Sequence, residues 1–115
     1  MDLQTLVSYI LPSWVELHFE VVSIESVSGK LEIGLDELNI SPLVDEGKKL
    51  ESKGFLPVVH LEDFPLRGKA VLLKVRRRKW KDPSTGKTIT NNWKLAVEGT
   101  SYTEEFALFL KKLLG

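Results

Sequence analysis

The residues with the clearest chemical meaning in this chain form a run of cations that ends in an aromatic side chain. Residues 71–81 begin with alternating apolar and polar residues and continue with four consecutive cations, Arg76 to Lys79, followed by Trp80. Adjacent cations repel one another, and a fold tolerates them where water or an anionic partner screens their charge. The run is therefore a candidate surface for binding phosphate groups, and the alternative is a solvated charged edge that prevents strand pairing.

The period of the pattern predicts a β-strand with two different faces, because successive side chains point to opposite sides of a strand. The face expected to join the core carries Val71, Leu73 and Val75. The face expected to meet solvent carries Lys74, Arg76, Arg78 and Trp80. Arg77 and Lys79 then lie on the other side, unless a bulge near Trp80 exchanges the two sets.

The formal net charge is zero, but the charges are strongly segregated along the chain. Residues 1–66 hold four Lys or Arg and twelve Asp or Glu, whereas residues 67–94 hold ten cations and one acid. A basic segment of this kind inside a neutral chain is typical of a phosphate-binding surface. The alternative is that the acids neutralise the basic segment within the fold. We expect such neutralisation to be incomplete, because twelve acids spread along the chain cannot all reach one hairpin.

The basic strand is predicted to form a long antiparallel hairpin with the segment that follows it. Residues 82–86 have turn chemistry, since Pro83 fixes its φ angle and Gly86 can adopt a left-handed conformation. The return strand is expected over residues 87–97, where Trp93 can stack on Trp80 or on a base. A two-stranded ribbon fits the major groove of DNA, and its cations can also straddle phosphates. The candidate DNA-binding residues are Lys74, Arg76, Arg77, Arg78, Lys79, Trp80, Lys81, Lys87 and Lys94.

Residues that could carry catalysis or hold a metal ion are sparse. The chain has no cysteine, and its two histidines, His18 and His60, lie far apart in the sequence. A zinc site needs more nitrogen or sulfur ligands than these. The chain also lacks a glycine-rich phosphate loop and a Ser/His/Asp arrangement with a usable context. We therefore expect no catalytic residue, no metal and no cofactor.

The first half of the chain is predicted to contain two helices and a hairpin. Apolar residues at helical spacing between Leu3 and Leu11 predict a helix that Pro12 ends. Residues 13–16 have the form of a capping box that would start a second short helix. Residues 19–26 and 30–35 predict two strands joined by a tight turn, and residues 39–54 are expected to form a loop whose lysines, Lys48, Lys49 and Lys53, could extend a phosphate surface.

The second half leads into and out of the basic hairpin. Residues 55–61 predict a strand that Pro57 places at an edge, and residues 63–68 predict a turn. Residues 101–104 form a second capping box before a helix that continues to the end of the chain. The predicted fold is a small α+β domain of antiparallel hairpins between an N-terminal and a C-terminal helix. It is divided into residues 1–54 and 55–115, and its two terminal helices are expected to share one core because the chain is short.

The stretch from His60 to Phe106 resembles a known family. It combines the segment 60–69, the basic strand with Trp80, then Trp93 and residues 99–106. In this pattern the chain resembles the N-terminal region of bacterial insertion-sequence transposases of the ISL-three type. Many of those proteins continue with a cysteine zinc ribbon, whereas this chain has residues 82–87 at that place. It is similar to the short, cysteine-free N-region proteins of such elements, which makes the expected fold a ribbon without zinc.

The resemblance implies a DNA-binding module that helps a transposase recognise transposon ends, with the catalytic chemistry on another polypeptide or on a further part of the protein. It implies DNA contacts by the basic strand and carries over no metal ligand. Two other classes remain open: a protein–protein adaptor whose apolar helices dock a partner, and an RNA-binding module. No segment predicts a membrane span or a signal peptide, so a cytoplasmic protein is expected.

Overall fold

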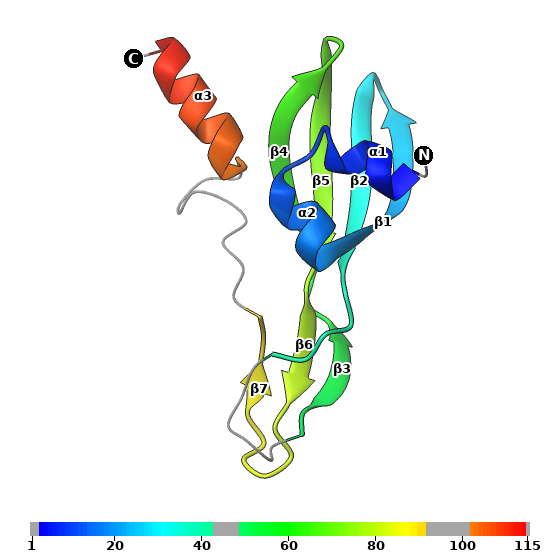
Figure 1. Cartoon of the computed structure of the whole chain (residues 1–115), viewed down its shortest axis with the longest axis vertical. Coiled ribbons are helices and arrows are strands. Elements are labelled where there is room, and N and C mark those ends of the chain that lie inside the picture. Colours follow the sequence, from blue (N-terminus) through cyan, green and yellow to red (C-terminus); the bar gives the residue numbers. More distant parts are fainter. Residues whose placement is uncertain (1–2, 43–48, 92–101, 115) are drawn as a thin grey trace.

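The computed structural model describes residues 3–42, 49–91 and 102–114. Within these residues it contains two β-sheets and three short helices (Figure 1). The elements are α1 (Leu3–Ser8), α2 (Ser13–His18), β1 (Phe19–Val27), β2 (Lys30–Glu37), β3 (Glu51–Phe55), β4 (Val59–Leu66), β5 (Lys69–Arg76), β6 (Arg78–Lys81), β7 (Thr88–Ile89) and α3 (Glu104–Leu114). The predicted class, α+β with antiparallel hairpins and helices at both ends, is confirmed.

The larger sheet is built from two hairpins that lie side by side. Its strand order is β1-β2-β5-β4, and the hairpins β1–β2 and β4–β5 are antiparallel. The hairpins meet through β2 and β5, which run parallel with Leu31 opposite Val71. This parallel pair joins segments about 40 residues apart in the sequence, and local sequence patterns do not predict it.

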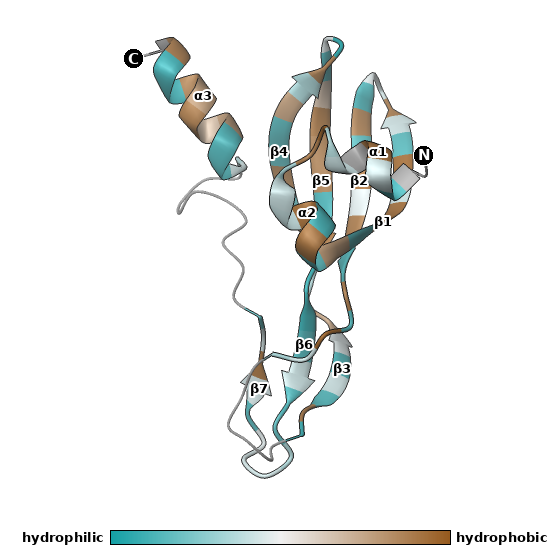
Figure 2. Ribbon diagram, in the orientation of Figure 1, coloured by the Kyte–Doolittle hydropathy of each residue, from teal (hydrophilic) through white to brown (hydrophobic). Residues whose placement is uncertain are grey.

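The core lies between one face of the larger sheet and the two N-terminal helices, which cross that face (Figures 1 and 2). Val71, Leu73 and Val75 are at most 2% exposed, so the predicted core face of the basic strand is confirmed. Trp14 of α2 packs edge-on against Phe19, with ring centroids 5.3 Å apart. The other buried members of this core are Leu11, Val15, Ile33, Leu35 and Leu61.

The smaller sheet contains the end of the basic segment. Its strand order is β3-β6-β7, and the segment predicted as one strand is divided at Arg77 between β5 and β6. The turn over residues 82–86 is confirmed: the Thr85 and Gly86 amides donate to the Asp82 carbonyl, and Gly86 has φ of 75°. The return strand β7 is short, and residues 92–97 of the predicted strand, with Trp93 and Lys94, lie outside the described residues.

Three local predictions outside the basic segment were wrong in part. Ser13 is the first residue of α2 and makes no cap there, because the helix already begins after Pro12. Residues 51–55 form a strand where a loop was expected. They pair with β6, and their own composition does not predict this pairing. The strand predicted over residues 55–61 instead runs from Val59 to Leu66, with an irregular register between Asp63 and Leu66. The turn predicted over residues 63–68 is therefore present but limited to Arg67 and Gly68.

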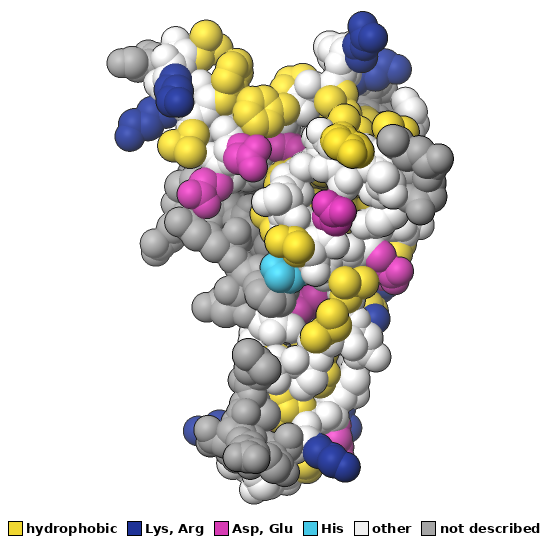
Figure 3. All heavy atoms as spheres, in the orientation of Figure 1, with side chains coloured by type: hydrophobic (Ala, Val, Ile, Leu, Met, Phe, Trp, Pro, Cys, Tyr) yellow, Lys and Arg dark blue, Asp and Glu magenta, His cyan; other side chains and the backbone are white. Residues whose placement is uncertain are grey.

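The C-terminal helix is attached at the edge of the larger sheet and does not join the core. Tyr102 pairs with Glu62 of β4, and the Thr103 amide donates to the Glu62 carbonyl at 2.9 Å. This contact, together with the packing of Phe106 and Phe109 against Phe64, holds α3 beside β4. Phe109 is 46% exposed, and apolar side chains are visible over α3 (Figure 3). The prediction that both terminal helices share one core is therefore wrong.

Candidate nucleic-acid interface

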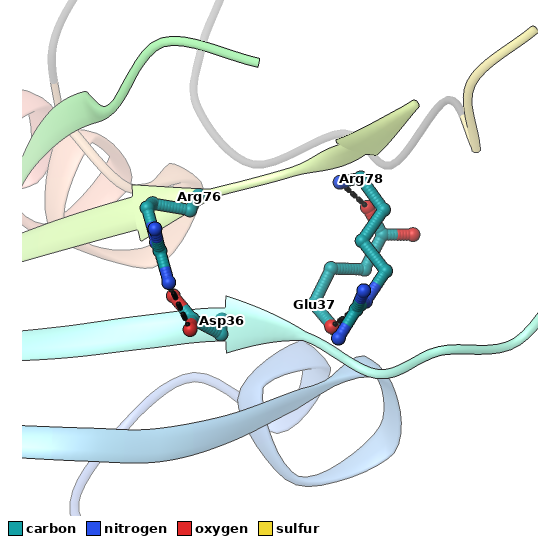
Figure 4. A network of polar contacts seen from close by, with 4 residues as sticks. All are labelled: Asp36, Glu37, Arg76 and Arg78. Atoms are coloured by element: carbon teal, nitrogen blue, oxygen red, sulfur yellow. Dashed lines mark hydrogen bonds and ion pairs between the residues drawn. The ribbon is translucent and has the colours of Figure 1, made fainter. Parts of the chain in front are cut away.

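Arg76, the first cation of the basic run, is bound to an acid on the neighbouring strand β2. Its Nε and Nη2 donate to the two carboxylate oxygens of Asp36 at 2.7 and 2.6 Å (Figure 4). Such two-point pairing is the favoured geometry between a planar guanidinium and a carboxylate. The hydrogen bond to Asp36 raises the pKa of Arg76 above its ordinary value. Arg76 is therefore fully charged, and its charge is balanced within the fold.

Arg78 forms hydrogen bonds with Glu37, the residue that follows Asp36 on β2. Its backbone amide donates to Glu37 Oε1 at 2.9 Å, and its Nε donates to the Glu37 carbonyl at 2.8 Å (Figure 4). Asn91 donates to the other carboxylate oxygen of Glu37 at 2.8 Å. Glu37 is 1% exposed and thus joins the end of β2, the start of β6 and the segment after β7.

Phe55 completes this junction between the two sheets. The guanidinium carbons of Arg76 and Arg78 lie 4.1 and 4.5 Å from the centroid of its ring. Cations placed over an aromatic face at this distance are attracted by the ring quadrupole. The residues of this junction, which we call the arginine junction, are Asp36, Glu37, Phe55, Arg76 and Arg78.

Lys74 follows the same pattern further along β5, where it forms an ion pair of 3.3 Å with Glu32. Lys74, Arg76 and Arg78 were predicted to meet solvent freely. The structure instead supplies carboxylates from β2 to Lys74 and Arg76, because the parallel pairing of β2 with β5 brings the acidic part of the chain beside the basic part. The Arg78 guanidinium donates to the backbone carbonyl of Glu37. Internal neutralisation, the alternative noted for the segregated charges, therefore applies to Lys74 and Arg76.

Trp80 is buried, at 2% exposure, so its predicted place on the solvent-facing side was wrong. It lies on β6, the central strand of the smaller sheet, opposite Ser52 on one side and Ile89 on the other. The face assignment failed because the backbone interrupts the strand at Arg77 and the following residues belong to another sheet. A base cannot stack on Trp80 while it stays in this position.

Outside the arginine junction, four predicted site residues have no ion pair in the described part of the chain: Arg77, Lys79, Lys81 and Lys87. Lys81 and Lys87 are exposed beside the turn that joins β6 to β7, and Arg77 and Lys79 are half-buried. Lys79 and Lys81 lie on the face of β6 opposite Trp80. Lys and Arg side chains are visible at this end of the molecule (Figure 3). Lys53, on β3, is paired with Glu51 at 3.1 Å, and Lys48 lies outside the described residues.

The open face of the larger sheet carries a shallow hollow of about 320 Å³. Its lining residues are Val22, Ser23, Gly34, Asp36, Val58, Lys74 and Arg76. Since both cations in this lining already have carboxylate partners, the hollow offers little free charge to a ligand. The sequence did not single it out, and only the parallel join of the two hairpins assembles it.

The described residues contain no group of three or more His, Cys, Asp or Glu placed to hold a metal ion. None of the helices that the structure describes is long and apolar enough to cross a membrane. Comparison with protein-family models, with curated protein sequences and with solved structures finds no match.

Proposed function

We propose that this protein binds DNA, as an N-terminal or accessory module of an insertion-sequence transposase that recognises transposon ends without catalysis of its own. The observation that carries the proposal is the group of cations Arg77, Lys79, Lys81 and Lys87, which we call the small-sheet cations. They remain without a carboxylate partner among the described residues, although the chain supplies acids to the cations nearer the core.

The spacing of these cations suits a phosphate backbone. Lys79 and Lys81 are two residues apart on one face of β6, so their Cα atoms are about 7 Å apart. Each DNA strand carries one negative charge per 3.4 Å of helix axis, so two successive steps cover about the same distance. The turn after β6 adds Lys87 to the same end of the molecule. The resemblance of residues 60–106 to transposase N-regions adds the expected partner, a catalytic transposase polypeptide, and transposon ends as the target.

The proposal is tested by the salt dependence of binding to short duplexes, including transposon-end sequences. Four phosphate contacts should make log affinity fall against log salt with a slope of about −3 to −4. Lys81→Gln with Lys87→Gln should flatten that slope by about two and leave the thermal midpoint nearly unchanged, because exposed charges add little stability. A wild-type protein that shows no salt-dependent binding to any DNA at low salt would overturn the proposal.

A matched control removes the same number of cations from the arginine junction. Arg76→Gln with Arg78→Gln should lower the thermal midpoint and change the salt slope little, because these side chains are engaged with Asp36 and Glu37. Should the junction pair alone control the slope, the small-sheet cations are not the binding surface.

A second candidate function, a protein–protein adaptor, is favoured by the apolar side chains exposed on the helices. Tyr9 of the segment after α1 is 78% exposed, and Leu17 of α2 and Leu113 of α3 are 64% and 67% exposed. The RNA-binding alternative is less favoured, because Trp80 is buried and cannot stack on a base. Competition between duplex DNA, single-stranded DNA and RNA for the wild-type protein separates the nucleic-acid classes, and binding of none of them favours the adaptor.

A further inference from the structure

The two hairpin turns of the larger sheet share one unusual backbone conformation. Ser28 and Gly29 have φ angles of 50° and 79°, and Arg67 and Gly68 have 52° and 77°. Two consecutive residues with positive φ define the tight turn that suits the twist of a hairpin, and Asn, Asp and Gly are its preferred residues. An arginine in this conformation is costly to the fold, because its Cβ crowds the backbone. Strained backbone of this kind concentrates at functional positions.

Each turn also carries cations at its tip. Lys30 follows Gly29 in the first turn, and Arg67 and Lys69 flank Gly68 in the second. All three side chains are exposed, and none has an ion pair in the part of the chain that the structure describes. We call Lys30, Arg67 and Lys69 the tip cations.

The topology places the two turns next to each other. Because β2 and β5 are parallel neighbours and Leu31 lies opposite Val71, both hairpins turn at the same end of the sheet (Figure 1). The centres of the two turns are separated by two strand spacings, or about 10 Å. The tip cations thus form one two-pronged basic end, which the sequence analysis did not recognise because the two turns are far apart in the chain.

This basic end lies at the opposite end of the molecule from the small-sheet cations. The molecule is elongated, with extents of 50 × 35 × 25 Å, and its strands run roughly along the long axis (Figure 1). The turns of the larger sheet and the turn between β6 and β7 therefore point in opposite directions. A duplex that lies across one end of the molecule therefore leaves the cations at the other end free to contact a second duplex.

We propose that the tip cations are a second phosphate-binding site, which takes the backbone of a second DNA segment while the small-sheet cations hold the first. One molecule then bridges two duplexes. This inference rests on the proposed DNA-binding function and adds a second site to it.

The test counts duplexes bound per protein and measures energy transfer between duplexes labelled with donor and acceptor dyes, at low salt and with duplex in excess. The wild-type protein should bind two duplexes and bring the dyes together. Lys30→Gln with Arg67→Asn should bind one duplex, retain the affinity and salt slope of the first, and abolish the transfer. Asn is preferred at this turn position, so the variant should fold at least as well as the wild type.

The matched control, Lys111→Gln with Lys112→Gln, removes two exposed cations from the last turn of α3 and should leave two duplexes bound. Energy transfer that persists in the tip variant, or a wild type that binds one duplex only, would overturn the bridging inference and leave the proposed function standing. A wild type that binds no DNA would overturn both.

Discussion

At the scale of single residues, the most informative side chain outside the interface is Asp63. It is 4% exposed, and its carboxylate accepts a hydrogen bond of 2.8 Å from Thr103 Oγ1, just before α3 begins. Burial raises the pKa of Asp63 from 3.8, and the hydrogen bonds from Thr103 and from the Phe64 backbone oppose this increase. The Asp63 carboxyl group therefore binds its proton more tightly in the folded protein than in the unfolded chain.

The sign of the resulting pH dependence follows from linkage. Asp63 favours the folded state most at pH below 3.8, and this contribution declines as the pH rises from 3.8 through the folded-state pKa. The asparagine of Asp63→Asn stays neutral at all of these pH values and can still accept the hydrogen bond from the Thr103 hydroxyl. The stability of this variant relative to the wild type should therefore increase as the pH rises. Urea midpoints of both proteins from pH 3.5 to 7 measure the difference. The two proteins share every other acidic group, and parallel curves would show that burial does not perturb Asp63.

Glu37 is the residue on which the arginine junction depends. Glu37→Ala removes the acceptor of the Arg78 amide and of the Asn91 side chain, and a buried donor left without an acceptor costs about 1–3 kcal/mol. We expect the free energy of unfolding to fall by roughly 2–4 kcal/mol in chemical denaturation. Glu16→Ala, at an exposed helix position, is the control and should change it by less than about 0.5 kcal/mol. Equal effects of the two substitutions would contradict the structural role of Glu37.

At the scale of the elements, Gly34 explains how β1 and β2 stay paired across an irregular register between Val21 and Ser23. A Cβ atom at Gly34 would collide with Ser23 Oγ, whereas the next atoms, Val22 Cγ2 and Ser23 Cβ, would lie at 3.3 and 3.5 Å. The serine hydroxyl thus occupies the space that a side chain at position 34 would need.

A double-mutant cycle tests this account of the bulge. Gly34→Ala should cost about 1–3 kcal/mol, the usual range for overpacking. In a Ser23→Ala background the colliding oxygen is absent, and the same change should cost less than about 1 kcal/mol. The measurement is the unfolding free energy of the four proteins. A cost that does not depend on residue 23 would place the clash in the backbone and not in the hydroxyl.

The attachment of α3 gives a second prediction about elements. Phe106 lies 5.3 Å from the ring of Phe64 and 5.5 Å from that of Tyr102, whereas Phe109 contacts Phe64 at 5.3 Å and is 46% exposed. Phe106→Ala should therefore destabilise by about 2–3 kcal/mol and Phe109→Ala by about 1–2 kcal/mol, below the 3–5 kcal/mol of a fully buried phenylalanine. Thermal or urea unfolding measures both. The opposite order would mean that α3 is rotated against β4.

At the scale of the whole molecule, no disulfide or cysteine-bound metal can stabilise the chain, since it contains no cysteine. In zinc-dependent domains, metal binding energy is folding energy. Thermal melts of this protein with and without a strong chelator should coincide, because the turn over residues 82–87 is stabilised by its own hydrogen bonds, including those of Ser84 to Asp82 Oδ1 at 2.9 and 2.6 Å. A large decrease of the midpoint in chelator would contradict this expectation.

Local elements with strong residue patterns could be predicted from the sequence. The alternation of apolar and polar residues predicted that Val71, Leu73 and Val75 share one buried face. This was possible because the face of a strand residue depends only on its position along the strand. Gly29 and Gly86 marked two turns, since positive φ angles favour glycine. The segregation of charge along the chain was also visible, and it led to the small-sheet cations within a larger candidate set.

Which cations remain without a carboxylate partner depends on how the strands assemble in the fold. Asp36 reaches Arg76 because β2 and β5 pair across about 40 residues of sequence, and the same pairing brings the two hairpin tips together. Trp80 is buried because the chain enters a second sheet after Arg77, and Trp80 lies on the central strand of that sheet. Such contacts depend on how strands assemble in space, and a period-two pattern contains no information on the partner that a strand will meet.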